Sequence, residues 1–241
     1  MKVHAAALPD MGEVKGILFD IDGTLCDSDP LHLAVFQDLL EEEGFRGGER
    51  IDHAFFNEHI AGRHNPEIAR DLFPDWTEEA RVAFYTRKEA EFRRRAVAGG
   101  LAPVEGLGDF LRWVEGSGIK RIAVTNAPRE NAEVMLRALG LEGFFAGVVL
   151  GEACARAKPH PDPYLEGMRR LGVSAGEAVA LEDSPSGMRA AVAAGLPCFG
   201  VLTGQTEETL VRAGAVATVR DYRELMALVG IGEAPAAGQS A

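Results

Sequence analysis

The sequence predicts an α/β fold, a doubly wound parallel sheet with an inserted α-helical cap, and two observations support this prediction. Short apolar runs that end on polar residues alternate with helical segments from about residue 99 onward, which is typical of βαβ units. Residues 30–98 contain no strand pattern, and residues 231–241 are small and polar. We therefore predict a core of residues 14–29 and 99–230, a cap of residues 30–98 and a flexible tail of residues 231–241.

The first strand of the core is the apolar run of residues 17–19, which ends on Asp20. Asp22 follows two positions later, so an extended chain places both carboxylates on the same side. Two adjacent carboxylates repel each other and need a cation, a proton or a reaction to justify them. One can attack an electrophilic phosphorus while the other transfers protons, and a solvated Asp-Gly turn is the alternative.

The segment after this strand predicts helices, which we expect at residues 30–45, 51–60, 67–72 and 77–97. Lys88 and the three arginines of residues 93–95 are expected on exposed faces of the last of these helices. We single out His32, Arg63, His64 and Lys88 as cap side chains that could contact a substrate. A surface role or a helix-packing role is the alternative for each of them.

The rest of the core alternates strands with helices. We expect strands at residues 120–126, 146–150, 178–183, 198–202 and 215–219. Helices are expected at residues 105–115, 130–139, 160–171, 186–194, 207–213 and 222–229. The carboxyl ends of parallel strands meet at one edge of the sheet, where ligands bind in open α/β folds.

Polar groups gather at these strand ends. Thr125 and Asn126 follow one strand, and Glu182 and Asp183 end another, while Lys158 precedes a helix. Taken singly, the strand-end groups could be helix caps, and the lysine could lie on the surface. In combination with the two aspartates of the first strand, they favour phosphoryl chemistry.

The same groups suit a magnesium ion. Mg²⁺ prefers a few carboxylates, here Asp20 and Asp183, and the backbone carbonyl of Asp22 could add a further ligand. Lys158 and the Thr125 hydroxyl are donors for phosphate oxygens. The sequence contains no glycine-rich loop ending in Lys-Ser or Lys-Thr, which excludes an NTPase of that kind.

Length and charge limit the remaining classes. The 241 residues can bury a sizeable core, and the formal net charge of -12 comes with no basic run suited to nucleic acid or an anionic membrane. No apolar stretch is long enough for a transmembrane helix, and residues 1–12 resemble no targeting signal. Cys26, Cys154 and Cys198 are scattered without metal-ligand spacing. We expect a cytoplasmic monomer that binds a small phosphorylated substrate, and neither nucleic acid nor membrane.

Four motifs stand out along the chain: Asp20-Ile21-Asp22-Gly23-Thr24-Leu25-x-Asp27-Ser28, Val124-Thr125-Asn126, Lys158-Pro159 and Glu182-Asp183-Ser184. In this order they resemble the haloacid dehalogenase superfamily, in its branch with an α-helical cap that contains β-phosphoglucomutase and phosphoglycolate phosphatase. The resemblance covers residues 16–226. More narrowly, residues 25–32, 60–65 and 124–128 are similar to plant broad-range sugar-phosphate phosphatases.

This resemblance implies an Mg²⁺-dependent phosphatase that hydrolyses small phosphate monoesters, sugar or polyol phosphates, through an aspartyl-phosphate. It implies that Asp20 is the nucleophile and that Asp22 is the general acid and base. The implied phosphate-binding and substrate-binding residues are Thr125, Asn126, Lys158, Arg63, His64 and His32. The implied metal site comprises Asp20, Asp22, Asp183 and Glu182, the last as a ligand or as a partner of the ligands.

A sugar phosphomutase of the β-phosphoglucomutase type is the alternative. In those mutases the cap loop carries an arginine for the second phosphate, and Asn65 takes that place here, although Arg63 lies close by. This difference and the Thr24 type of first motif favour hydrolysis. Dehalogenation needs neither Asp22 nor Mg²⁺, and a non-catalytic binding protein on the same fold has no need for the polar residues of the four motifs.

Overall fold

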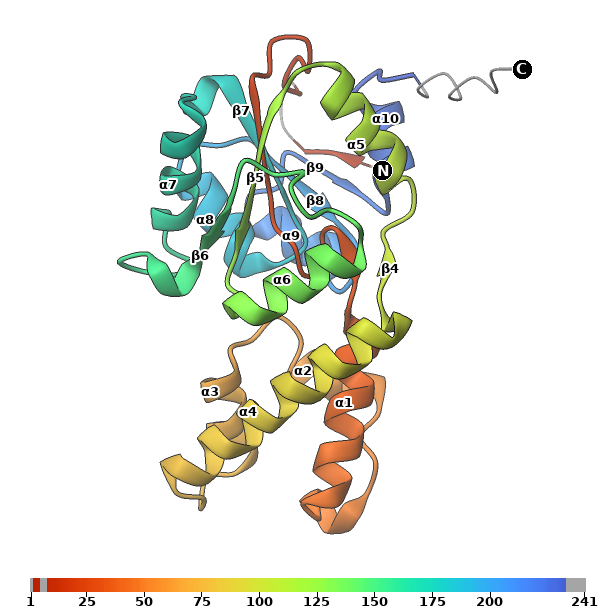
Figure 1. The fold of residues 1–241 in the computed structure, drawn as a ribbon, viewed down its shortest axis with the longest axis vertical. Coiled ribbons are helices and arrows are strands. Elements are labelled where there is room, and N and C mark those ends of the chain that lie inside the picture. The colour runs from red at the N-terminus through yellow and green to blue at the C-terminus, as the bar shows by residue number, and fades with distance from the viewer. Residues whose placement is uncertain (1, 5–7, 233–241) are drawn as a thin grey trace, which may run out of the picture.

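The core of the computed structural model, which describes residues 2–4 and 8–232, is a seven-stranded sheet in the order β1-β9-β8-β7-β2-β5-β6 (Figure 1). Its pairs are parallel except that of β1 with β9, which is antiparallel. The strands are β1 (Lys2–Val3), β2 (Gly16–Phe19), β5 (Lys120–Thr125), β6 (Val148–Leu150), β7 (Ala178–Glu182), β8 (Cys198–Val201) and β9 (Ala217–Val219). The predicted fold class is confirmed, and residues 233–241 of the predicted tail lie outside the described residues.

Helices cover both faces of this sheet because side chains alternate along each strand. Leu18 of β2 packs with one group of helices, and its neighbours Ile17 and Phe19 pack with the other group. The first group is α7 (Asp162–Leu171), α8 (Pro185–Ala193) and α9 (Glu207–Arg212). The second is α5 (Leu107–Gly116), α6 (Arg129–Ala138) and α10 (Tyr222–Leu228).

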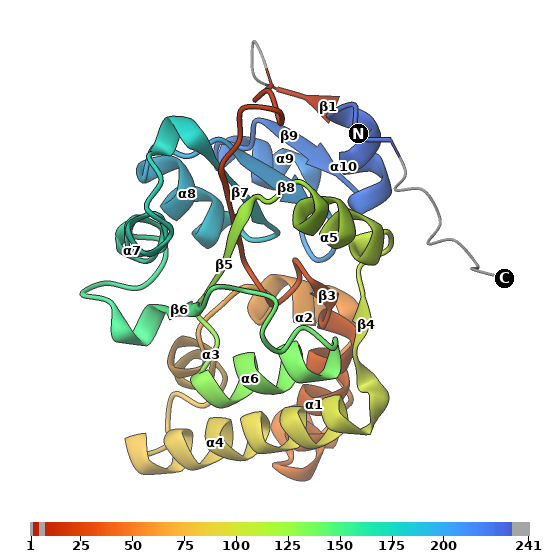
Figure 2. The same cartoon turned by 45° about the horizontal axis from the view of Figure 1, so that its top comes forward.

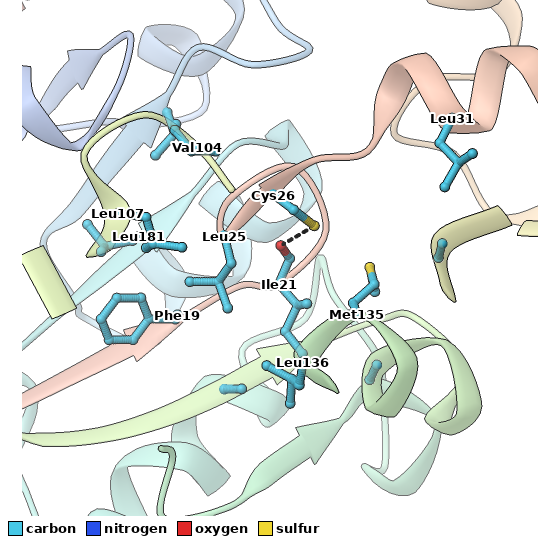
Figure 3. Packing of buried hydrophobic residues seen from close by; sticks show 14 of the residues in the cluster. Phe19, Ile21, Leu25, Cys26, Leu31, Val104, Leu107, Met135, Leu136 and Leu181 are labelled. Carbon is cyan, nitrogen blue, oxygen red and sulfur yellow. Dashed lines mark hydrogen bonds between the residues drawn. The ribbon is translucent and has the colours of Figure 1, made fainter. Parts of the chain in front are cut away.

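The loop after β2 is anchored by its own apolar side chains. Ile21 and Leu25 are fully buried, and Figure 3 shows them beside Phe19 and Leu181. The amide of Leu25 donates to the carbonyl of Ile21 over 2.9 Å, and the ring of Phe19 meets that of Phe110 edge-on at 6.2 Å. Burying a side chain of this size contributes about 1.5–3 kcal/mol, so the loop that carries the two aspartates is held rigidly.

Residues 30–98, all described, contain helices and no strand, as predicted. Their core is aromatic, with Phe36, Phe56, Phe73 and Phe84 in mutual contact. The helices are α1 (Asp29–Glu42), α2 (His53–His59), α3 (Asn65–Leu72) and α4 (Glu78–Arg95). Two short helical turns, η1 (Phe45–Gly48) and η2 (Ala96–Gly100), follow α1 and α4. Two others, η3 (Gly151–Ala153) and η4 (Ala175–Glu177), lie between elements of the sheet.

The two crossings between sheet and helical segment lie side by side. The two-residue strands β3 (Cys26–Asp27) and β4 (Ala102–Pro103) pair antiparallel, as Figure 2 shows, and the amide of Val104 donates to the carbonyl of Leu25 over 3.1 Å. The sequence did not predict this pair, because two residues give no periodic pattern. None of the described helices is long and apolar enough to cross a bilayer.

Candidate active site

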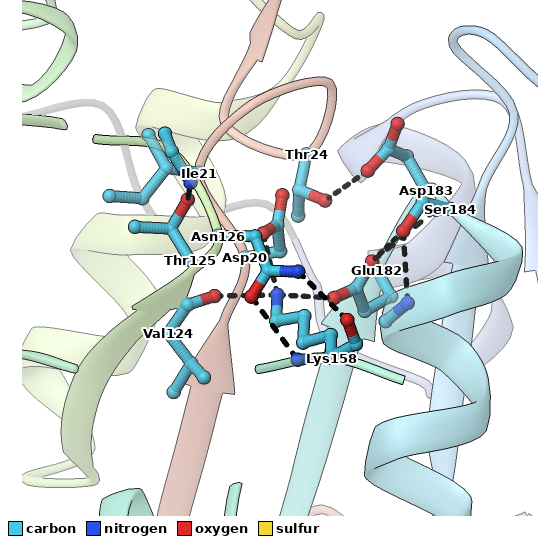
Figure 4. Close-up of polar contacts among 12 residues, drawn as sticks. Asp20, Ile21, Thr24, Val124, Thr125, Asn126, Lys158, Glu182, Asp183 and Ser184 are labelled. Carbon is cyan, nitrogen blue, oxygen red and sulfur yellow. Dashed lines mark hydrogen bonds and ion pairs between the residues drawn. The ribbon is translucent and has the colours of Figure 1, made fainter. Parts of the chain in front are cut away.

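The sheet places the predicted polar groups at one point. Strand β2 lies between β5 and β7, where the strand order reverses, which is the position at which open α/β sheets bind ligands. Asp20 follows β2, Thr125 ends β5 and Glu182 ends β7, so these side chains converge at the carboxyl edge (Figure 4). One pocket in this region is lined by Asp20, Asp22, Thr125, Asn126, Lys158 and Asp183, together with residues of the helical segment 30–98.

Lys158 is the cation of this cluster. Its buried ammonium donates to Asp20 Oδ1 over 2.7 Å, to Glu182 Oε1 over 2.6 Å and to the carbonyl of Val124 over 2.7 Å. Burial lowers the pKa of this lysine, but the two carboxylates outweigh burial, so the pKa lies above its ordinary value. Lys158 therefore stays charged and fixes the rotamer of Asp20.

Three carboxylates lie close enough together to share a metal ion. One oxygen each of Asp20, Glu182 and Asp183 falls within 4.8 Å of the others. Burial, with the repulsion of Glu182, raises the pKa of Asp20 to about 7 although Lys158 acts against the shift. Burial, then the charge of Asp20, likewise raises the pKa of Asp183 well above its ordinary value. A divalent cation relieves such crowding, so this donor set fits Mg²⁺.

The loop glycine makes the cluster compact. Gly23 has a φ of 82°, and a Cβ at this position would lie 2.1 Å from Asp183 Oδ2, so no larger residue fits. The hydroxyl of Thr24 donates to Asp183 Oδ1 over 3.3 Å. Glu182 is fully buried and also accepts from the hydroxyls of Tyr164 and Ser184 over 2.7 and 3.0 Å.

Asp22 is bonded by residues from the start of α1. Ser28 Oγ donates to its Oδ1, and His32 Nε2 lies 3.1 Å from its Oδ2. Burial raises the pKa of Asp22, but the charge of His32 and these hydrogen bonds outweigh burial and lower the pKa to about 2. The ring of His32 stacks on Phe92 of α4 with 4.2 Å between centroids, so this aspartate is connected through His32 to the helices of residues 30–98.

Thr125 and Asn126 differ in what they contact. Thr125 Oγ1 accepts from the amide of Ala127 over 3.0 Å and keeps its proton available to a ligand. The carboxamide of Asn126 pairs with the backbone of Lys158, donating to its carbonyl over 3.0 Å and accepting from its amide over 3.2 Å. Asn126 therefore positions the lysine, in addition to lining the pocket.

Side chains from residues 30–98 also line the pocket, with partners of their own. The guanidinium of Arg63 donates to the carbonyl of His59 over 2.8 Å and to Asp71 over 2.5 Å. His64 Nε2 lies 3.5 Å from Asn126 Nδ2. Lys88 was predicted on an exposed face, and this was wrong, since its side chain is buried beside Phe36 and Phe92.

Sequence reasoning missed Glu89 and Asn131. The carboxylate of Glu89, on α4, accepts from Asn131 on α6 and so joins these two helices. A glutamate in a charged helix resembles a surface residue, and an asparagine in a first helical turn resembles a cap, so neither type was informative. Ser28 lies within a recognised motif, and this position was the available signal for its contact with Asp22.

Comparison with known proteins gives consistent relatives. The family described as haloacid dehalogenase-like hydrolase matches residues 17–201. Protein CbbY of Cupriavidus necator is 33% identical over 203 residues, 76% of each chain, and a phosphorylated carbohydrates phosphatase of Thermotoga maritima is 29% identical over 209 residues, 86% of this chain and 94% of that one.

Solved structures agree in fold. A variant of CbbY from Rhodobacter sphaeroides, crystallised in complex with xylulose-1,5-bisphosphate, matches with a TM-score of 0.76 at 28% identity. The match covers 88% of this chain and 96% of that one. The family match covers residues 17–201, and the 33% identity to CbbY of Cupriavidus necator covers 76% of each chain, so together they establish the family. The chain belongs to the haloacid dehalogenase-like hydrolase family.

Proposed function

We propose that the protein is an Mg²⁺-dependent phosphatase that hydrolyses small phosphate monoesters, of the sugar or polyol phosphate class, through an aspartyl-phosphate intermediate. The observation that carries the proposal is the 2.7 Å contact of Lys158 with Asp20 in a pocket shared with Asp183. Relatives named as phosphatases of phosphorylated carbohydrates and of phosphoglycolate support the substrate class.

Asp20 is the proposed nucleophile toward phosphorus. Lys158 fixes its carboxylate, and the Lys158 ammonium and the Thr125 hydroxyl are the donors for the transferring phosphoryl oxygens. Mg²⁺ would be held by the carboxylates of Asp20 and Asp183 and by the backbone carbonyl of Asp22. Glu182 would support this site through its contact with Lys158. When bound, Mg²⁺ offsets the repulsion between carboxylate and anionic ester and stabilises charge in the transition state.

Asp22 is the proposed proton-transfer group. The pKa of about 2 leaves it ionised and ready to accept the proton of the water that attacks the aspartyl-phosphate. In the first step it must protonate the leaving alcohol. The charge of a bound phosphate ester raises the pKa of a neighbouring carboxyl, so Asp22 can take up a proton from solvent as the ester binds and then pass it to the leaving oxygen. Residues 30–98 close over the pocket in this proposal, excluding water and setting specificity.

Substituting Asp22 by asparagine is expected to lower kcat by roughly 10²–10⁴-fold, the usual contribution of general acid–base catalysis. KM should change little, because the carboxylate moves protons and does not grip the ester. Steady-state kinetics on a sugar phosphate provide the measurement. An unchanged kcat would remove Asp22 from the mechanism.

The proposed function itself is tested by phosphate release from a panel of sugar phosphates, polyol phosphates and phosphoglycolate. We expect release that needs added Mg²⁺, stops with EDTA and returns when Mg²⁺ is restored, because the crowded carboxylates need the cation. The proposal is wrong if no ester in the panel is hydrolysed with Mg²⁺, or if EDTA leaves the rate unchanged.

A further inference from the structure

The pocket-lining side chains from residues 30–98, here called the cap wall, include a buried carboxylate. Glu89 of α4 is 8% exposed and lines the pocket. Its Oε1 accepts from Lys88 Nζ over 2.8 Å and from Asn65 Nδ2 over 2.5 Å, and its Oε2 accepts from Asn131 Nδ2. Partners from α3, α4 and α6 thus hold the carboxylate in one place.

This carboxylate neutralises a cation that also lines the pocket. The ammonium of Lys88 lies 5.3 and 5.6 Å from the ring centroids of Phe36 and Phe92, so it is desolvated, and its charged partner is Glu89. Burial raises the pKa of Glu89, but Lys88 outweighs burial, so the pKa of this carboxyl lies below its ordinary value. Arg63, the other lysine or arginine of the described cap wall, is bound to Asp71.

Among the described residues, the wall formed by residues 30–98 offers no unpaired lysine or arginine. Of the three lysine and arginine side chains that line the pocket, Lys88 and Arg63 have carboxylate partners, and Lys158 lies at the phosphoryl end. A second phosphate directed at the cap would meet Glu89 without a free counter-ion, and burying such a charge unpaired is costly. A hydroxyl group can instead donate to the carboxylate and accept from Lys88 or Asn65.

We propose that Glu89 determines specificity: by neutralising Lys88, it makes the cap wall accept the hydroxyl groups of a phosphate monoester and reject a second phosphate. The inference rests on the proposed function, since it assigns the substrate class of that same pocket. Discrimination of this kind works through an unfavourable charge contact with the rejected ligand.

The test compares kcat/KM for fructose 1,6-bisphosphate with that for fructose 6-phosphate, two esters that differ by one phosphate. Glu89→Gln should raise the bisphosphate-to-monophosphate ratio by roughly tenfold or more, because the freed ammonium can pair with the second phosphate. Lys88→Gln should lower the ratio, since it leaves the carboxylate unopposed. The double variant should return the ratio to near the wild-type value.

Glu91→Gln is the matched control. It removes the same charge from the same helix, but Glu91 pairs with Arg94 and Arg95 and does not line the pocket. An unchanged ratio in Glu89→Gln, or an equal rise in the Glu91 control or in the double variant, overturns the inference. If circular dichroism shows that Glu89→Gln does not fold, the Lys88→Gln variant provides the test. An unchanged or raised bisphosphate-to-monophosphate ratio in Lys88→Gln then overturns the inference.

Two further measurements separate this inference from the proposed function. Hydrolysis of p-nitrophenyl phosphate, which has no second charged group, tests catalysis alone. Calorimetric binding of the two fructose phosphates to Asp20→Asn and to Asp20→Asn/Glu89→Gln gives the ratio without turnover. Active wild type with no change in the binding ratio rejects the inference only. An inactive wild type with the expected change rejects the proposed function and leaves the charge discrimination standing.

Discussion

Asp20→Asn is expected to lower kcat by on the order of 10⁴-fold or more, because a carboxamide oxygen does not attack phosphorus at a useful rate. The substitution keeps the size of the side chain and can still accept from Lys158, so the fold should persist. Steady-state kinetics with Mg²⁺ and circular dichroism provide the measurement. A variant that retains a tenth of the wild-type kcat would reject the nucleophile assignment.

The same variant has a stability signature that separates lost chemistry from lost folding. The folded-state pKa of Asp20 is raised from 3.8 to about 7, so the ionised carboxylate is unfavourable in the metal-free fold. The free-energy cost of the ionised Asp20 carboxylate reaches its maximum above pH 7 and decreases as the pH falls toward 4. Asp20→Asn should therefore raise the Tm of the metal-free protein at pH 8 and leave it nearly unchanged at pH 4.

Lys158→Met is expected to remove activity and to destabilise the protein by about 3–5 kcal/mol, the cost of leaving a buried charge uncompensated. Glu182 is 0% exposed and, among the residues that the structure describes, would keep only hydroxyl and amide donors, from Tyr164 and Ser184. Urea unfolding monitored by circular dichroism measures the change.

Lys120→Met is a suitable control for that experiment. Lys120 begins β5 on the exposed surface, and its ammonium donates to the carbonyl of Leu171 over 2.7 Å without facing a carboxylate in the described structure. Its loss should change the free energy of unfolding by about 0.5–1.5 kcal/mol. Equal effects at the two lysines would show that the buried ion pairs around Lys158 do not stabilise the fold.

The fold could be predicted because its strands are short apolar runs and its helices end at recognisable residues. β2 and β7 are fully buried, and their apolar character distinguishes them without any long-range information. The expected strand of residues 146–150 is shorter in the structure, where β6 is Val148–Leu150. Element ends depend on hydrogen bonds to neighbouring strands, which a local pattern does not contain.

The phosphoryl end of the site was predictable for a similar reason. Asp20, Thr125 and Glu182 lie at strand ends, and the parallel sheet brings such ends together. The cap wall was not predictable. Lys88 and Glu89 read locally as surface charges, and only the packing of α4 against α1, α3 and α6 buries them. The pairing of His32 with Asp22 likewise depends on the angle at which α1 leaves the core.

The nucleophile can be identified directly by mass spectrometry after a single turnover. Enzyme in excess over a sugar phosphate is quenched in acid within milliseconds and digested, and the peptide that contains Asp20 is weighed. We expect this peptide to carry one phosphoryl group in the wild type and none in Asp20→Asn. With p-nitrophenyl phosphate, whose leaving group needs no protonation, the phosphorylated fraction should be larger in Asp22→Asn, where the water that attacks the aspartyl-phosphate lacks its base. Hydrolysis of the ester with no phosphoryl group on this peptide in either the wild type or Asp22→Asn would contradict attack by Asp20.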